Sequence, residues 1–139
     1  MDIPAQLRRQ VIQRAHDLCE YCGIAQAGQE AVFHIDHVLP LNAGGETLSS
    51  NLALACVSCS LRKGARTHAT DPQSGIEAPL FNPRRDSWRL HFRWSGVSVV
   101  GLSPTGRATV AALSMNRPIA QDIRQEEALH GRHPSPKHL

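Results

Sequence analysis

The chain has few aromatic residues and no long apolar segment. Phe, Trp and Tyr make up 4% of its 139 residues, so the core that they can build is thin and a bound metal would help to hold it. No apolar run approaches the length that spans a bilayer, and the polar residues 1–10 are not followed by an apolar stretch. We therefore expect one compact domain in the cytoplasm, without a signal peptide and without membrane contact.

Cysteine is also scarce, but its spacing is informative. The four cysteines form two C-x-x-C pairs, Cys19 with Cys22 and Cys56 with Cys59. A reducing compartment disfavours disulfides, and the two-residue gap lets both thiolates of a pair reach one tetrahedral Zn²⁺ at about 2.3 Å. Buried free thiols and a redox switch are the alternatives, although a redox pair needs only one such motif beside a βαβ pattern, which is missing. We expect one structural zinc site.

The segment between the two pairs is the expected place of function. The 33 residues that separate Cys22 from Cys56 exceed the usual zinc-ribbon gap. They contain adjacent Asp36 and His37 on a predicted strand, where neighbouring side chains point to opposite faces unless the strand ends or twists. A carboxylate is a hard ligand for Mg²⁺ or Mn²⁺, and a neutral imidazole can take a proton from water. This pair predicts metal-assisted hydrolysis, and His34 shares the Asp36 face as a ligand or as a packing residue.

Charge is unevenly distributed, although the net charge is only +3. Residues 57–117 hold nine Lys and Arg against three acids, whereas residues 1–56 hold three Arg against six acids. The excess is almost all Arg, whose planar fork matches phosphate oxygens. This distribution favours a nucleic-acid partner, and a solvated basic surface is the alternative.

Hydrophobic periodicity predicts an α+β fold of short elements. Residues 1–66 are expected to form a core, residues 67–130 an extension that packs on it, and residues 131–139 a disordered tail. The predicted elements are a helix from Pro4 to Leu18, strands at 31–39 and 52–56, a helix from Ser58 or Ser60 to about Arg66, a connecting segment at 67–87, a strand or helical turn at 88–94, a strand at 97–102, a helix from Thr105 to before Pro118, and a helix at 118–129.

Three stretches of this chain resemble the motif of the HNH endonuclease family. They are Asp36-His37-Val38-Leu39-Pro40, Gly44-Gly45-Glu46-Thr47, and the run Asn51-Leu52-Ala53-Leu54-Ala55-Cys56-Val57-Ser58-Cys59-Ser60-Leu61-Arg62-Lys63. Further on, Leu80-Phe81-Asn82-Pro83-Arg84, Trp88, His91-Phe92 and Pro104-Thr105-Gly106-Arg107 look like the tail of small free-standing bacterial members. The resemblance implies the ββα-metal fold and a DNA endonuclease or nickase, with RNA also open as substrate and protein partners unknown.

The resemblance also implies roles for single residues. His37 would be the general base, Asp36 a ligand of the catalytic Mg²⁺ or Mn²⁺, and Asn51 the residue that holds the loop and orients the histidine. Arg62, Lys63 and Arg66 would bind phosphate.

One position departs from the family pattern, which usually has Asn or His where this chain has Ser60. A hydroxyl is a poor metal ligand, so water or His34 would have to help. The alternative function is a catalytically weakened, zinc-stapled nucleic-acid-binding module.

Overall fold

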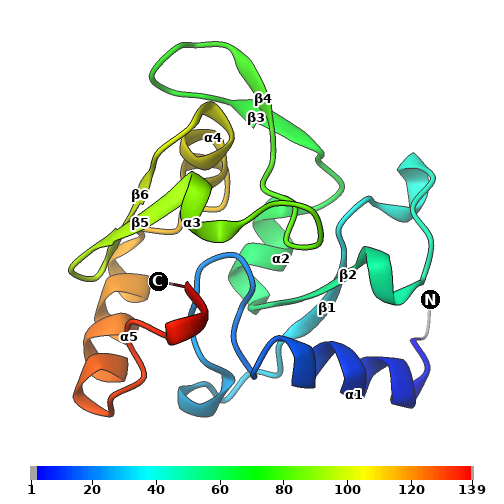
Figure 1. Cartoon of the computed structure of the whole chain (residues 1–139), viewed down its shortest axis with the longest axis horizontal. Coiled ribbons are helices and arrows are strands. Elements are labelled where there is room, and N and C mark those ends of the chain that lie inside the picture. The colour runs from blue at the N-terminus through cyan, green and yellow to red at the C-terminus, as the bar shows by residue number, and fades with distance from the viewer. Residues whose placement is uncertain (1–2, 139) are drawn as a thin grey trace.

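The computed structural model describes residues 3–138. It is a mixed α+β structure in which three separate two-stranded antiparallel sheets lie among helices (Figure 1). Parts of the predictions that fall on Met1, Asp2 and Leu139 lie outside the described residues. The elements are α1 (Ala5–Arg14), β1 (His34–His37), β2 (Leu52–Ala55), α2 (Val57–Lys63), β3 (His68–Thr70), β4 (Glu77–Pro79), α3 (Trp88–His91), β5 (Phe92–Ser95), β6 (Ser98–Gly101), α4 (Pro104–Ala112) and α5 (Pro118–Leu129), with short 3-10 turns at Gln26–Gly28, Leu41–Ala43, Ser49–Asn51 and Pro136–His138.

The unit β1–β2–α2 forms the centre of the N-terminal half. β1 pairs antiparallel with β2, with His34 opposite Ala55 and His37 opposite Leu52. β2 is buried along its whole length, because Leu and Ala alternate there and the small Ala side chains let neighbouring elements approach closely. This arrangement is the predicted ββα order, with a shorter first strand than residues 31–39. β1 pairs only with β2, so its other edge is left open.

Helix α2 begins earlier than predicted. Its N-cap is Cys56, whose sulfur accepts a hydrogen bond from the backbone N–H of Cys59. Neither Ser58 nor Ser60 caps it, because both lie inside the helix. The cysteine spacing therefore fixes the start of the helix as well as the second half of the metal site.

Helix α1 ends four residues before the predicted Leu18. His16 and Asp17 adopt left-handed backbone conformations, with φ of 55° and 58°. The reversal lets Leu18 bridge to Ala25 and lets the N–H of Cys19 donate to Ile24 O at 2.8 Å. The end of the helix at Arg14 thus allows the turn that carries Cys19 and Cys22.

The extension contains a hairpin within residues 67–87, where only a connecting segment was predicted. β3 pairs with β4, and Asp71 at the end of β3 accepts two hydrogen bonds of 2.9 Å from the guanidinium of Arg107 on α4. Asp71 has no exposed surface. A bidentate ion pair therefore holds the hairpin against α4.

Residues 88–94 adopt both of the predicted conformations in succession. α3 covers Trp88–His91, and β5 then begins at Phe92, which lies opposite Gly101 of β6. Trp88 and Phe92 pack with ring centroids 5.0 Å apart, and Trp88 Nε1 donates to Tyr21 O at 3.0 Å. These rings join the extension to the N-terminal half, so that one cluster of buried side chains runs through both.

The segment after Gly131, for which disorder is predicted from composition, packs on aromatic residues of the extension up to His138. His138 is 3% exposed, and its ring lies 5.0 Å from that of Trp88. Trp94 Nε1 donates to His138 O, at 2.6 Å. The proline-rich composition prevents a long helix, yet the segment covers the indole faces and buries apolar surface by doing so.

No helix within residues 3–138 combines the length and apolarity that a membrane crossing demands.

Candidate active site and metal centre

The four cysteines meet in one buried cluster. Their sulfur atoms all lie within 4.8 Å of one another, and Cys22 Sγ is 3.7 Å from Cys56 Sγ. A disulfide needs about 2.05 Å between its sulfurs, so this pair is not oxidised. Four sulfurs placed tetrahedrally at 2.3 Å from one ion lie about 3.8 Å apart. The cluster therefore has the size and donor set of a tetrathiolate metal site.

Backbone N–H groups already point at these sulfurs. The N–H of Cys22 donates to Cys19 Sγ and that of Cys59 to Cys56 Sγ, both at 3.4 Å. Burial raises the pKa of the Cys19 thiol, whereas hydrogen bonds from the other cysteines, Cys19 first, lower the pKa of Cys56. One thiolate is favoured on its own, and four thiolates so close together need a cation among them.

A buried arginine lies beside the cluster. Arg124 is 1% exposed, and its guanidinium donates to Cys22 O at 3.2 Å and to Val97 O at 2.9 Å. It also stacks on Trp94, with 5.3 Å from Cζ to the ring centroid. Burial lowers its pKa, and the neighbouring cysteines act in the opposite direction. A divalent ion with four thiolates carries a charge of −2, which this guanidinium partly offsets.

Asp36 is held by two donors. Tyr21 Oη donates to Asp36 Oδ2 at 2.9 Å, and Lys63 Nζ lies 3.2 Å from the same oxygen. Asp36 is 9% exposed and Lys63 only 2%. Burial raises the pKa of Asp36, while the Lys63 charge and the Tyr21 hydrogen bond pull that pKa back down. The other carboxylate oxygen, Oδ1, accepts no hydrogen bond from any described residue.

His37 is fixed by a loop that Asn51 closes. The Asn51 side chain accepts from Leu39 N at 2.8 Å and donates to Leu39 O at 3.0 Å and to Glu46 O at 2.9 Å. Thr47 of this loop forms a 3.0 Å hydrogen bond with His37 Nε2. Nδ1 of His37 has no hydrogen-bond partner within residues 3–138. Asn51 thus lies where the resemblance placed a loop-holding residue.

The loop also explains one of its glycines. A Cβ built on Gly45 would lie 1.8 Å from Leu39 O, so only glycine lets the backbone pass there. This close approach brings the segment containing Thr47 back against the strand that bears His37.

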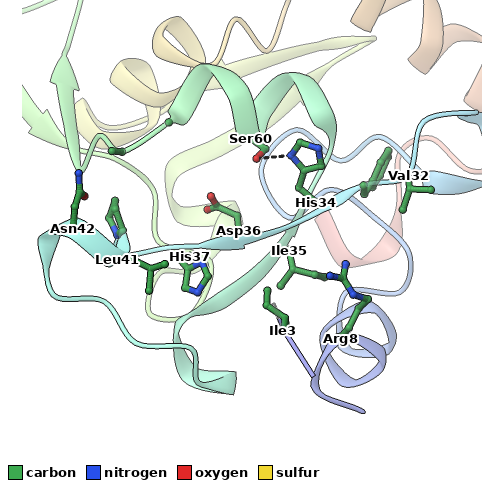
Figure 2. A pocket seen from close by; sticks show the side chains of 14 residues that line it. Ile3, Arg8, Val32, His34, Ile35, Asp36, His37, Leu41, Asn42 and Ser60 are labelled. Carbon is green, nitrogen blue, oxygen red and sulfur yellow. Dashed lines mark hydrogen bonds between the residues drawn. The ribbon is translucent and has the colours of Figure 1, made fainter. Parts of the chain in front are cut away.

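Asp36 and His37 line the same cavity from opposite faces of β1. Figure 2 shows Asp36, His34 and Ser60 on the side of the strand that faces α2, while His37 points to the other side. The cavity, of about 730 Å³, is lined by both side chains. His34 Nδ1 and Ser60 Oγ are hydrogen-bonded at 2.9 Å, and both side chains lie on the Asp36 side of β1 (Figure 2).

The predicted phosphate-binding cations are distributed differently from the expectation. Lys63 is turned inward, and its Nζ also donates to His37 O at 3.1 Å. Arg62 hydrogen-bonds Ser58 and Ser114, and Arg66 donates to two backbone carbonyls; neither lines the active-site cavity. The exposed cation that does line it is Arg8 of α1.

Sequence reasoning gave no role to three residues that the structure brings to the site. Tyr21 lies inside the first C-x-x-C pair and Thr47 ends the Gly-Gly-x-Thr stretch, so both stood within recognised motifs. Arg8 could have been found only by placing the predicted N-terminal helix against β1. For Tyr21 and Thr47, position inside a recognised motif was therefore the one sequence feature that could have indicated a role.

The fold has the ββα order that the resemblance implied. Residues 19–66 match the family model for HNH endonuclease, which confirms the resemblance seen in the sequence. The match covers 48 of the 139 residues and ends before the extension. Comparisons with curated proteins and with solved structures returned no match to the chain.

Proposed function

We propose that this protein is a divalent-metal-dependent endonuclease that hydrolyses phosphodiester bonds of DNA. The observation that carries the proposal is that Asp36 and His37 line one cavity from the two faces of β1, within the HNH-matching segment. A carboxylate and an imidazole at one cavity supply the two groups that metal-assisted hydrolysis requires.

His37 acts as the general base in this proposal. When its Nε2–H donates to Thr47, the Nδ1 lone pair is available to take a proton from a water molecule. The resulting hydroxide attacks phosphorus while the P–O bond to the leaving oxygen breaks, and the leaving oxygen takes a proton from solvent. The imidazolium that forms stays anchored to the loop held by Asn51. Proton transfer of this kind contributes about 10²–10⁴-fold to rate.

Asp36 supplies the anionic ligand for the catalytic ion. Its Oδ2 is occupied by Tyr21 and Lys63, and Oδ1 is the oxygen left for a metal. His34 and Ser60 add neutral donors on the same side of β1 (Figure 2). Mg²⁺ or Mn²⁺ bound there would stabilise negative charge on the phosphate and on the leaving oxygen.

We assign zinc to the cysteine cluster because tetrahedral four-thiolate sites are typical of structural zinc. Elemental analysis of protein purified without added metal should find one zinc per chain, and Cys56→Ser should lose both the zinc and the cooperative unfolding transition. Iron in place of zinc, or a folded metal-free variant, would contradict the assignment.

The test of the nuclease function is conversion of supercoiled plasmid to nicked or linear form with Mg²⁺, with Mn²⁺ and with EDTA. We expect cleavage with either ion and none with EDTA. The same reactions, run on single-stranded RNA, show whether the enzyme acts on DNA alone.

A second candidate is a binding module that cuts slowly or not at all. The buried Asp36–Lys63 pair and the weak hydroxyl of Ser60 favour it, because each reduces the negative charge or the donor strength offered to a metal. Salt-sensitive plasmid binding without cleavage under any metal would select this function. In both cases we place the protein in the cytoplasm, where the four thiols stay reduced.

A further inference from the structure

A second cavity lies behind the active site. It measures about 450 Å³ and is lined by three separate parts of the chain. Val38, Leu39 and Asn51 come from the loop that positions His37, Lys63 and Arg66 from the end of α2, and His68 with residues 79–82 and Arg85 from the extension. The end of α2 and the chain after β4 therefore meet at this cavity.

The lining of this cavity is basic. Lys63, Arg66, His68 and Arg85 contribute to it, and no Asp or Glu does. Lys63 is paired with Asp36, so its charge is largely compensated. Arg66 donates to the carbonyl oxygens of Arg62 and Ala112, which leaves its positive charge without a counter-ion. The cavity therefore carries an unpaired positive charge even before Arg85 is counted.

Arg85 is the cation best placed to meet a ligand. It is exposed, and its side chain makes no hydrogen bond or ion pair with any residue from 3 to 138. Its neighbour Arg84, by contrast, is engaged with the buried Glu20. The two adjacent arginines thus differ in role. Arg84 holds the extension to the N-terminal half, and Arg85 lines the cavity without a side-chain partner among the described residues.

The loop that presents Arg85 is itself held in place. Asn82 Oδ1 accepts from Arg84 N at 2.9 Å and from Arg85 N at 3.3 Å, and Asp86 Oδ2 accepts from Asn82 N at 2.9 Å. The Asn82-Pro83-Arg84-Arg85 turn is therefore ordered before any ligand binds, which reduces the entropy lost on binding. This turn belongs to the Leu-Phe-Asn-Pro-Arg stretch, for which the proposed chemistry gives no role.

The cavity is joined to the active site through shared residues. Asn51, which closes the His37 loop, lines it, and Lys63 contacts both Asp36 and His37 O. A strand whose scissile bond lies at the open edge of β1 thus has a second basic recess within the same small domain. Phosphates are the anions that such a strand repeats along its length.

We propose that this second cavity binds a backbone phosphate of the nucleic-acid strand that the active site cuts, with Arg85 and Arg66 as the phosphate ligands and His68 beside them. The inference rests on the proposed function, since it places nucleic acid in the active-site cavity. In this proposal the extension, outside the HNH-matching residues 19–66, contributes part of the substrate-binding surface.

The test measures binding rather than cutting. A short fluorescein-labelled DNA duplex is titrated with protein in EDTA over a series of KCl concentrations, and fluorescence anisotropy gives Kd at each. The variants are Arg85→Ala, Arg85→Glu and Arg85→Lys. Arg89→Ala and Arg89→Glu are matched controls, because Arg89 is also exposed, makes no side-chain hydrogen bond or ion pair with a described residue, and lies outside the cavity.

We expect Arg85→Ala to weaken binding roughly threefold to tenfold at low salt and to lower the slope of log Kd against log salt by about 0.9, the value for one lost phosphate contact. Arg85→Glu should weaken binding further and Arg85→Lys should restore most of it. The Arg89 variants should leave the salt slope within error of wild type.

Equal losses of DNA affinity in the Arg85 and Arg89 variants would reject phosphate binding by the cavity, since such losses would reflect net charge alone. Poly-glutamate that competes as well as DNA would also reject it, in favour of an acidic protein partner. An Arg85-specific loss in a protein that never cleaves plasmid would support the cavity and reject the nuclease function, so the two failures are distinguishable.

Discussion

The hydroxyl of Tyr21 donates a 2.9 Å hydrogen bond to Asp36 Oδ2, and Tyr21 lies between two cysteines of the metal cluster. The turn that carries Cys19 and Cys22 therefore also orients the carboxylate proposed to bind the catalytic metal. We expect the cysteine site to be structural only, and the Tyr21 hydrogen bond gives it a direct link to Asp36.

Tyr21→Phe should reduce metal-dependent cleavage about tenfold to a hundredfold, the usual cost of removing a hydrogen bond to a metal-binding carboxylate. The side chain keeps its volume and its edge-on packing against Phe81, so stability should fall by only about 1 kcal/mol. Plasmid cleavage and urea unfolding check the two parts. Full activity in a normally folded Tyr21→Phe protein would show that the coupling is not functional.

Lys63→Met should destabilise the protein by about 3–5 kcal/mol, because it leaves the Asp36 carboxylate buried without its cation. Arg62→Met, on the exposed face of the same helix, is the matched control and should cost less than about 0.5 kcal/mol. Urea unfolding measures both. Adding Asp36→Asn to Lys63→Met should recover part of the loss; a double variant as unstable as the sum of the two single changes would contradict the buried-pair account.

Ser60→Asn should raise the rate of metal-dependent cleavage. A carboxamide oxygen is a better ligand than a neutral hydroxyl, and Ser60 already faces the side of β1 that carries Asp36 (Figure 2). The change also alters the His34–Ser60 hydrogen bond, so Ser60→Ala, which removes that bond without adding a donor, serves as the control. Initial rates at several Mn²⁺ concentrations make the comparison, and a lower rate in Ser60→Asn would reject the assignment of this position.

The Asp71–Arg107 pair makes stability depend on pH at the acidic end. Hydrogen bonds from Arg107 hold the pKa of Asp71 well below its usual range. Ionised Asp71 therefore stabilises the folded state fully at pH values above the pKa of an unfolded Asp, near 3.9. This stabilisation is lost as the pH falls from there toward the lower pKa of Asp71 in the folded state. The stability difference between wild type and Arg107→Gln should therefore shrink between about pH 4 and pH 2.

Urea unfolding of both proteins at a series of pH values measures this difference directly. The pairwise comparison cancels the acid sensitivity of the cysteine cluster, which both proteins share. A difference that stays constant through the acidic range would mean that Arg107 stabilises the hairpin by packing alone.

The sequence predicted best those features that depend on spacing along the chain. The two C-x-x-C pairs predicted the four-cysteine cluster, and the pattern of residues 31–66 predicted the ββα order. It predicted contacts between distant segments poorly. The resemblance implied that Lys63 binds phosphate, but nothing local in the sequence indicated that Lys63 would be buried, because its partner Asp36 lies 27 positions away.

Contacts with distant segments also account for the packing of residues 131–138, which the local sequence does not indicate. Composition alone suggested disorder after Gly131, since nothing local there favours a regular element. The indole rings that residue 138 covers come from more than forty positions earlier in the chain, so the packing could not be anticipated from the segment itself. The Arg107 pairing with Asp71 was hidden for the same reason.

The central claim is that His37 removes a proton from the attacking water. The most direct test is plasmid cleavage by His37→Gly in Mg²⁺, with and without added imidazole, because free imidazole can enter the open cavity beside β1 and replace the missing ring. We expect a rate about 10²–10⁴-fold below wild type that rises with imidazole concentration and with the fraction of neutral imidazole. Cleavage by His37→Gly at the wild-type rate, or a loss that imidazole does not restore while DNA binding is intact, would contradict it.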